Sequence, residues 1–184
     1  MIQVGGWGAG DSGPGVLSIS NPPPPNGSDD CASAPAVSGN LLIPFDSTSA
    51  TTGAEGQHNG RQNNDIWWAW TADANGTATF STCNDSGATA GNVNYDTTIG
   101  VYHNGGVCPG AIEAPASYND DGGGCANFSS HLGGVAVTSG STYMIQVGGW
   151  GAGDLGTGIL AIDLTADPPP AEDDCARALA IAGQ

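Results

Sequence analysis

The stretch "MIQVGGWGAGDLGTGILAID" (Met144–Asp163) determines how the chain divides, because the chain also opens with a near copy of it, "MIQVGGWGAGDSGPGVLSIS" (Met1–Ser20). The copies are identical over their first eleven letters and afterwards differ only at alternate positions, which have even numbers in the first copy. Alternate side chains of a β-strand point to opposite faces. We therefore expect a strand whose unchanged residues, Leu160 and Ile162, face a core, with a glycine-rich turn before it.

A second repeated segment sets the boundaries of the repeat. "PPPPNGSDDCASAPAVSG" (Pro22–Gly39) matches "PPPAEDDCARALAIAG" (Pro168–Gly183), so that Cys175 is the copy of Cys31. We therefore interpret the chain as a part of a longer tandem array. We expect the proline-rich linkers to be extended spacers of about 3 Å per residue. The predicted parts are the last strands of one repeat (1–20), a linker (21–28), a whole repeat (29–163), a second linker (164–172) and the start of a third repeat (173–184).

Composition favours an all-β fold for this repeat. The chain has 31 glycines and 12 prolines in 184 residues and little helical periodicity, which is typical of short strands joined by turns in a two-sheet sandwich. In the aromatic strand 65–71, either Ile66, Trp68 and Trp70 or else Trp67 and Ala69 face the core. The predicted strands are 41–45, 65–71, 76–82, 97–103, a weak one at 111–117, 134–138, 142–148 and 157–164.

The charge balance is strongly acidic. Asp and Glu number 18 against two arginines, Arg61 and Arg177, and the formal net charge is -16. Such a surface repels nucleic acid and anionic lipid and attracts divalent cations, although solubility alone is another explanation of the acidity. No apolar run approaches the roughly 20 residues of a membrane span. We expect no nucleic-acid partner and no membrane span.

The whole repeat contains four cysteines, Cys31, Cys83, Cys108 and Cys125. An even number in an acidic chain with glycosylation sequons predicts two disulfides and an extracellular or cell-surface location. Three pairings are open, and we favour Cys31 with Cys83 and Cys108 with Cys125. Zinc is the weaker alternative because no Cys-x-x-Cys spacing occurs.

Four Asn-x-Ser/Thr sequons make the chain a candidate glycoprotein. O-linked sugar on the proline linkers and the Ser/Thr-rich loops is equally open. The candidate N-linked sites are Asn26, Asn75, Asn84 and Asn127.

Clusters of Asp and Asn predict calcium (Ca²⁺) as a cofactor. Calcium takes six to eight oxygen ligands, and adjacent carboxylates repel unless something neutralises them. The strongest cluster is "NDD" on a glycine-rich loop, while the alternative for any single residue is a turn-forming hydrogen bond to the backbone. The candidate ligands are Asp29, Asp30, Asn64, Asp65, Asp96, Asn119, Asp120 and Asp121.

No catalytic motif is visible in the chain. His58, His103 and His131 are scattered, and neither an H-E-x-x-H nor a G-x-S-x-G pattern occurs. We expect this segment not to be an enzyme.

The order of the motifs adds a family resemblance. "SDDC" (Ser28–Cys31), "NDIWWAW" (Asn64–Trp70), "YDTTIGVY" (Tyr95–Tyr102) and "YNDDGGGC" (Tyr118–Cys125), followed by the Met144 stretch, resemble the bacterial pre-peptidase C-terminal domain family in its cysteine-bearing, tandemly repeated form. The resemblance implies a jelly-roll-like β-sandwich, secretion, no catalysis and a calcium site that maps onto Asp29, Asp30, Asn64 and Asp65. The Glu-rich run that usually precedes the first acidic pair is missing here.

Two functions fit these observations. The first is a structural subunit of an extracellular, calcium-stabilised and glycosylated filament or surface array that associates with identical repeats. In that case Met1–Ser20 pairs with the sheet edge of a neighbouring repeat, and exposed aromatic residues are buried between units. The alternative is a carbohydrate- or matrix-binding module of a secreted hydrolase, with Trp7, Trp150 and Tyr118 as a candidate aromatic platform.

Overall fold

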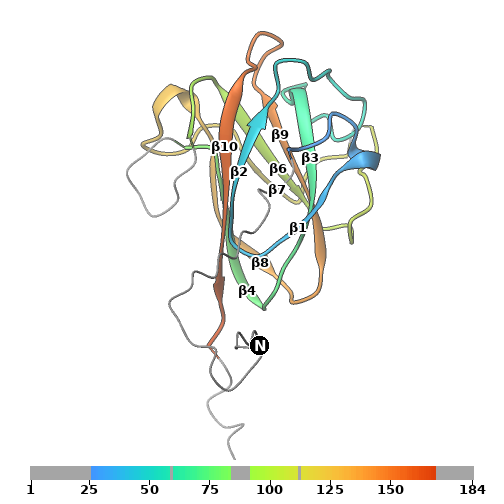
Figure 1. Ribbon diagram of the computed structural model, residues 1–184, viewed down its shortest axis with the longest axis vertical. Coiled ribbons are helices and arrows are strands. Elements are labelled where there is room, and N and C mark those ends of the chain that lie inside the picture. The colour runs from blue at the N-terminus through green and yellow to red at the C-terminus, as the bar shows by residue number, and fades with distance from the viewer. Residues whose placement is uncertain (1–25, 59, 84–91, 112, 169–184) are drawn as a thin grey trace, which may run out of the picture.

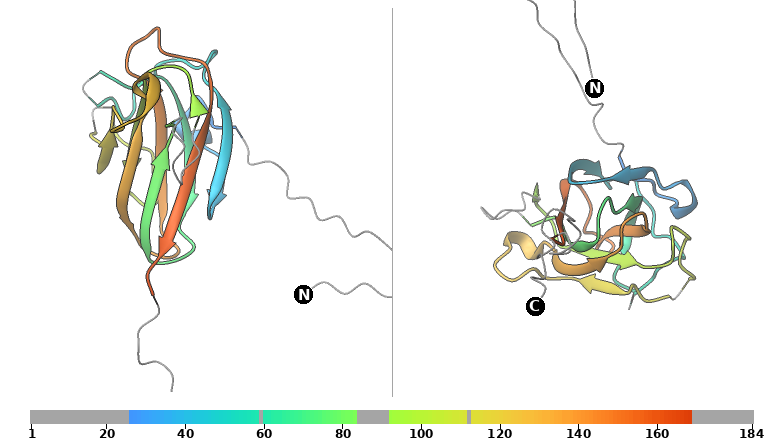
Figure 2. Two further views of the ribbon diagram at one scale, coloured as in Figure 1. Left: turned by 90° about the vertical axis from the view of Figure 1, so that its left-hand side faces the viewer. Right: turned by 90° about the horizontal axis from the view of Figure 1, so that it is seen from below.

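The computed structural model describes residues 26–58, 60–83, 92–111 and 113–168. They form two β-sheets packed face to face (Figures 1 and 2), which confirms the predicted all-β sandwich. The predictions for Met1–Ser20, Asn84 and the third repeat with Cys175 lie outside the described residues.

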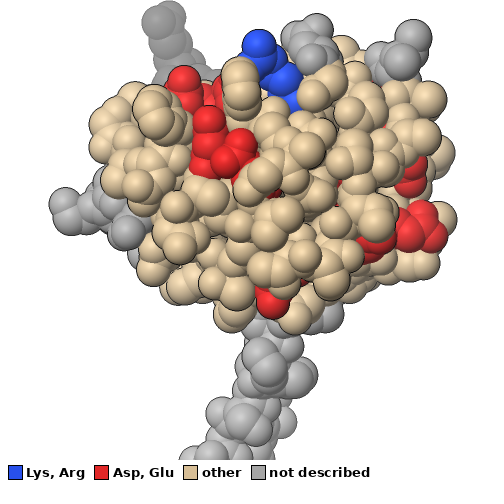
Figure 3. All heavy atoms as spheres, turned by 90° about the horizontal axis from the view of Figure 1, so that it is seen from above, with Lys and Arg blue, Asp and Glu red and all other residues tan. Residues whose placement is uncertain are grey.

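We name the two sheets A and B. Sheet A has the order β1-β3-β9-β6-β7, and sheet B has the order β2-β10-β4-β8, with β5 paired to β10. Figure 3 views the molecule from the end at which β10 begins. The strands are β1 (Ala36–Ser38), β2 (Leu41–Asp46), β3 (Asn63–Thr71), β4 (Gly76–Ser81), β5 (Asn92–Val93), β6 (Thr97–Tyr102), β7 (Ser117–Asn119), β8 (His131–Val137), β9 (Thr142–Gly149) and β10 (Thr157–Ala166), with short 3-10 segments η1 (Cys31–Ser33) and η2 (Ala126–Phe128).

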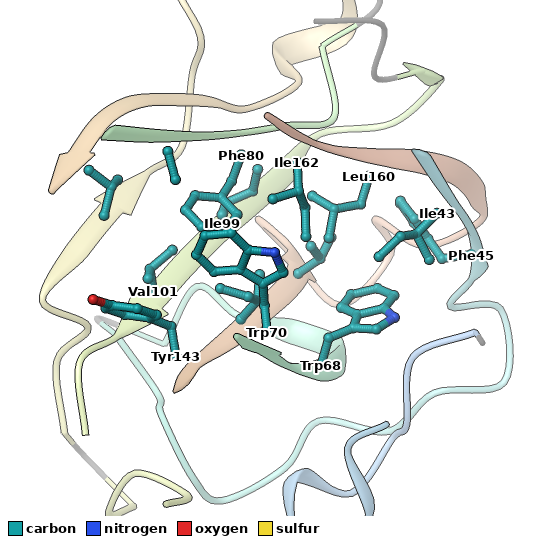
Figure 4. Close-up of a cluster of buried hydrophobic side chains, with 14 of the residues drawn as sticks. Ile43, Phe45, Trp68, Trp70, Phe80, Ile99, Val101, Tyr143, Leu160 and Ile162 are labelled. Carbon is teal, nitrogen blue, oxygen red and sulfur yellow. The ribbon is translucent and has the colours of Figure 1, made fainter. Parts of the chain in front are cut away.

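The main core lies between the two sheets. Trp68 and Trp70 of β3 point from sheet A toward side chains of sheet B (Figure 4), and the Trp70 ring meets the Phe80 ring edge-on at 5.4 Å between centroids. Leu160 and Ile162 are buried in the same cluster, as the alternation between the two sequence copies predicts. Burying each such large apolar side chain contributes about 2–3 kcal/mol.

The outer face of sheet A carries a second, smaller core. Trp67 is fully buried there with Tyr102 and Met144, under the segment that contains Cys31. Both faces of the aromatic strand β3 are therefore covered. Ile66, Trp68 and Trp70 face the main core, and Trp67 faces the smaller one.

The favoured disulfide pairing is wrong. The disulfides join Cys31 to Cys108 and Cys83 to Cys125. Cys31 packs in the smaller core on the outer face of sheet A, whereas Cys83 follows β4 in sheet B. Pairing each cysteine with its neighbour in sequence ignored this separation of the two sheets.

Most strands lie where the sequence predicts them, with differences at their ends. The described residues of 111–116 form no strand, and the short β7 begins only at Ser117. β10 continues to Ala166, inside the predicted linker, because Leu164 to Ala166 pair with β4. The described residues contain no helix with the length and apolar character needed to cross a bilayer.

Candidate metal centre

Three of the predicted calcium ligands converge at one end of the sandwich. Asp96 immediately precedes β6, while Asp120 and Asp121 immediately follow β7. β6 and β7 are antiparallel with Ile99 opposite Asn119, so the start of one strand lies beside the end of the other. One carboxylate oxygen from each of the three aspartates lies within 4.8 Å of the others. We call this group the acidic cluster.

Two oxygens of the acidic cluster lack any partner. Oδ1 of Asp96 and Oδ1 of Asp120 are both shielded from solvent and accept no hydrogen bond. An unsatisfied buried polar group costs about 1–3 kcal/mol, and more when it is charged. Both residues belong to the group of three whose carboxylates approach one another, so these unsatisfied oxygens make the cluster the candidate metal centre.

A fully buried hydroxyl lies in β6, two residues after Asp96. Thr98 is 0% exposed and its Oγ1 has no hydrogen-bond partner. Extending the β6–β7 register by one residue from Ile99 and Asn119 places Thr98 opposite Asp120 on the same face of sheet A. The hydroxyl of Tyr118, two residues before Asp120, is also buried without a partner. The cluster therefore borders a layer of unsatisfied polar atoms.

The electrostatics of the cluster oppose negative charge. Partial burial, followed by repulsion from Asp120, Asp154 and Asp121, raises the pKa of Asp96 to about 6, and Arg61 only partly offsets this. Burial and the Asp121 charge also raise the pKa of Asp120. A bound divalent cation would remove this repulsion and favour the ionised carboxylates.

Arg61 and Trp150 form the rim of the cluster. The Arg61 guanidinium carbon lies 4.4 Å from the centroid of the Trp150 ring, and the backbone N–H of Trp150 donates to the Asp96 carbonyl at 3.3 Å. Figure 3 shows a group of acidic side chains and, near it, a basic side chain at this end of the molecule. The hairpin loop between β9 and β10 therefore contacts the segment that carries Asp96.

Asn119 belongs to the same loop but points elsewhere. Its Oδ1 accepts a hydrogen bond from the His131 N–H at 2.8 Å, and its Nδ2 donates to the carbonyl of Asp121. The Asn119 side chain therefore braces the loop against β8.

Three of the other four predicted ligands, Asp29, Asn64 and Asp65, bond to the segment 51–53. Asp29 accepts from the N–H of Thr51 at 2.5 Å, and the backbone N–H of Asn64 donates to the Thr52 hydroxyl at 3.2 Å. The Asn64 side chain donates to the Ala152 carbonyl at 3.0 Å. Asp30 instead caps η1 by accepting from the Ala32 N–H at 3.0 Å.

Asp65 is a structural carboxylate in this arrangement. It is 0% exposed and accepts hydrogen bonds from Gly53 N–H (3.0 Å), Trp67 Nε1 (2.7 Å) and Gln146 Nε2 (2.9 Å). Burial raises the pKa of Asp65, and the hydrogen bonds oppose that rise. Its oxygens already have donors, in contrast to those of Asp96 and Asp120.

Sequence reasoning did not predict the roles of Thr98, Arg61 and Asp154. The sequence around Thr98 indicates only that it lies in a strand. Asp154 belongs to the surroundings of the cluster because its charge raises the pKa of Asp96. Asp154 also accepts a hydrogen bond from the Gly151 N–H at 2.9 Å, which shapes the hairpin that carries Trp150. The strand register places Thr98 beside the acidic cluster, whereas Arg61 lies in the loop before β3 and Asp154 in the loop between β9 and β10.

The histidines contact aromatic or hydroxyl groups. His58 lies against the Tyr118 ring and His103 against the Tyr143 ring. His131 Nδ1 is 3.3 Å from Ser81 Oγ, but Ser81 is completely buried. A substrate therefore has no access to this hydroxyl.

The sequons within the described residues are at the surface. Asn26, Asn75 and Asn127 are all exposed. Asn127 has a φ of 57°, a left-handed conformation that asparagine tolerates better than most residues.

No family model, curated protein or solved structure matches the chain. The resemblance to the pre-peptidase C-terminal family therefore stays a prediction from the motifs.

Proposed function

We propose that the protein is a calcium-stabilised structural module of an extracellular tandem array that associates through identical repeats. The observation that carries this proposal is the convergence of Asp96, Asp120 and Asp121 with two solvent-shielded oxygens that have no donor. A bound cation would satisfy both oxygens at once.

The donor set favours calcium over other metals. The cluster consists only of carboxylates, whereas zinc prefers cysteine and histidine. Magnesium demands a near-ideal octahedron, while calcium accepts irregular ligands from flexible loops together with water. Asp121 is exposed, which leaves the solvent side of the site open to water.

Calcium at this position would stabilise the fold. It would link the start of β6 to the loop that follows β7, and this loop is held at its far end by the Cys83–Cys125 disulfide. Any ligand that binds only the folded state raises stability by mass action. Extracellular modules typically bind calcium with dissociation constants of about 10⁻⁴–10⁻³ M, which matches extracellular supply.

The array part of the proposal rests on the sequence repeat and the disulfides. The segments before and after the whole repeat copy its own end and beginning, and two disulfides suit an oxidising environment. Glycans at the exposed Asn26, Asn75 and Asn127 would add to its protection outside the cell. We assign the described residues a structural and not a catalytic role, consistent with the burial of Ser81.

Calcium titration with thermal melting tests the site. We expect saturating calcium to raise the melting temperature of the chain by about 5–10 °C relative to excess chelator. The double variant Asp96→Asn/Asp120→Asn should lose this response, and the exposed control Asp167→Asn should keep it. An unchanged melting temperature in the unmodified chain, together with no heat of binding by calorimetry, would refute the calcium site.

The array is tested by sedimentation and negative-stain imaging of the chain with calcium and with chelator. We expect concentration-dependent association into linear particles that chelation loosens. Monomers at all concentrations in both conditions would contradict the array while leaving the calcium result untouched.

A further inference from the structure

Trp150 is held rigidly yet faces solvent. Trp67, Trp68 and Trp70 are each 0% exposed, whereas Trp150 is 44% exposed. Its backbone is fixed by two hydrogen bonds, from its own N–H to the Asp96 carbonyl and from Asn63 Nδ2 to its own carbonyl at 3.2 Å. The Arg61 guanidinium stacks over the ring. Tryptophan is a residue type enriched at interfaces, where its apolar ring packs against a partner.

Trp150 adjoins the proposed cation site through its backbone, because its N–H donates to the Asp96 carbonyl. Calcium takes six to eight oxygens, and three carboxylates approach one another in the acidic cluster. The buried side of the cluster holds the unpartnered Thr98 hydroxyl, while Asp121 faces solvent. Coordination positions on the solvent side are therefore open to the oxygens of a ligand.

The exposed Trp150 ring, Arg61 and the proposed cation site together indicate the chemical class of the ligand. A sugar ring offers an apolar C–H face that packs on an indole and vicinal hydroxyls that ligate calcium. The five N–H donors of Arg61 match further hydroxyls. Polyanions are disfavoured by the net charge of -16, and a purely apolar peptide would make no use of the cation.

We propose that Trp150, Arg61 and calcium held by the acidic cluster form a binding site for neutral polysaccharides. This inference rests on the proposed calcium site and adds a ligand to it. Of the other aromatic residues suggested by the sequence, Trp7 lies outside the described residues, and Tyr118 does not take part as a stacking surface. Its ring packs against His58 at 4.5 Å between centroids, and its hydroxyl is buried.

Affinity electrophoresis in native gels tests the inference. The gels contain one neutral polymer each (mixed-linkage β-glucan, galactomannan, hydroxyethyl cellulose or laminarin) or alginate as the anionic comparison, with calcium or with chelator. We expect at least one neutral polymer to retard the chain in calcium only. Trp150→Ala should weaken that binding at least about tenfold. Leu155→Ala, which removes an apolar side chain 36% exposed on the same hairpin, should bind as the unmodified chain does.

Calorimetry with calcium alone separates the two proposals. We expect the unmodified chain and Leu155→Ala to bind calcium alike, because Leu155 belongs neither to the acidic cluster nor to its rim. Normal calcium binding without retardation by any neutral polymer overturns the polysaccharide site and leaves the calcium site standing. Absence of calcium binding refutes the proposed function itself.

Three further outcomes also overturn the polysaccharide site. They are equal retardation in chelator, undiminished binding by Trp150→Ala, and loss of self-association in Trp150→Ala by sedimentation without any polymer binding. The last result would assign Trp150 to the contact between copies of the chain.

Discussion

Asp96 is a partly buried carboxylate, is repelled by neighbouring aspartates and is one of the proposed calcium ligands. Its pKa in the folded protein is about 6, above the ordinary value of 3.8, chiefly because of burial and then because of the neighbouring aspartates. Without calcium, its contribution to stability is therefore fully present below about pH 4 and is lost as the pH rises through about 6. Calcium requires the ionised form, so its stabilising effect has the opposite pH dependence.

We expect the calcium-induced rise in melting temperature to appear as the pH increases from 5 to 7. In chelator, the unmodified chain should lose stability over the same range relative to Asp96→Asn, because the variant has no charge to bury. Thermal melts of both proteins at pH 4–8, with calcium and with chelator, measure this. A calcium response that is the same at pH 4.5 and pH 7.5 would contradict the assignment of Asp96 as a ligand.

Asp65 has the opposite role, because its oxygens already have donors. Asp65→Ala would leave Gly53 N–H, Trp67 Nε1 and Gln146 Nε2 without this acceptor in a buried layer. We expect the free energy of unfolding to fall by about 2–4 kcal/mol. Urea denaturation measures the loss, with the exposed Asp167→Ala as the control. Equal midpoints for the two variants would show that the buried network contributes little.

At the residue scale, the sequence predicted the acidic cluster only in part. Asp96, Asp120 and Asp121 were expected as ligands because of their residue type and their loops. Their meeting depends on the pairing of β6 with β7, which alternation cannot reveal because β7 is three residues long. For the same reason the sequence did not identify Thr98 as a residue of the site. It becomes relevant only because the strand register places it opposite Asp120.

At the scale of elements, long strands were predictable and short ones were not. β3, β6, β9 and β10 have apolar patterns long enough to be recognised, and Leu160 and Ile162, which are unchanged between the two sequence copies, mark the core face directly. β1 and β5 have three and two residues, too few for any periodicity. The predicted disulfide pairing was wrong for a related reason. The pairing follows the arrangement of the two sheets and not the order of the cysteines along the chain.

The two disulfides should differ in their effect on calcium binding. Removing either one, as Cys31→Ser/Cys108→Ser or as Cys83→Ser/Cys125→Ser, should lower the free energy of unfolding by about 4 kcal/mol. Only the second pair holds the loop that carries Asp120 and Asp121, through Cys125. We expect calorimetry to show weaker calcium binding in that variant alone, under conditions where both variants remain folded. Equal calcium affinities would show that the loop needs no covalent anchor.

At the scale of the whole molecule, the net charge of -16 opposes the compact state. Salt screens such repulsion, with a Debye length of about 10 Å at 0.1 M. We expect the melting temperature in chelator to rise with sodium chloride between 0.05 and 0.5 M. The rise should be smaller in calcium, because part of the charge is then already neutralised. Salt-independent melting in chelator would show that the acidic groups do not strain the fold.

The Cys31–Cys108 disulfide would also govern how the proposed array responds to tension. Pulling along the chain would load Cys31 and pass across the sulfur bridge to Cys108, a separation of 77 residues in sequence. The segment between them, which contains β1 to β6, could not be drawn out even if its hydrogen bonds were lost. The load would pass to the strands that follow Cys108, which are β7 to β10. Within the described residues, the extension of a repeat would therefore be limited to the part of the chain after Cys108.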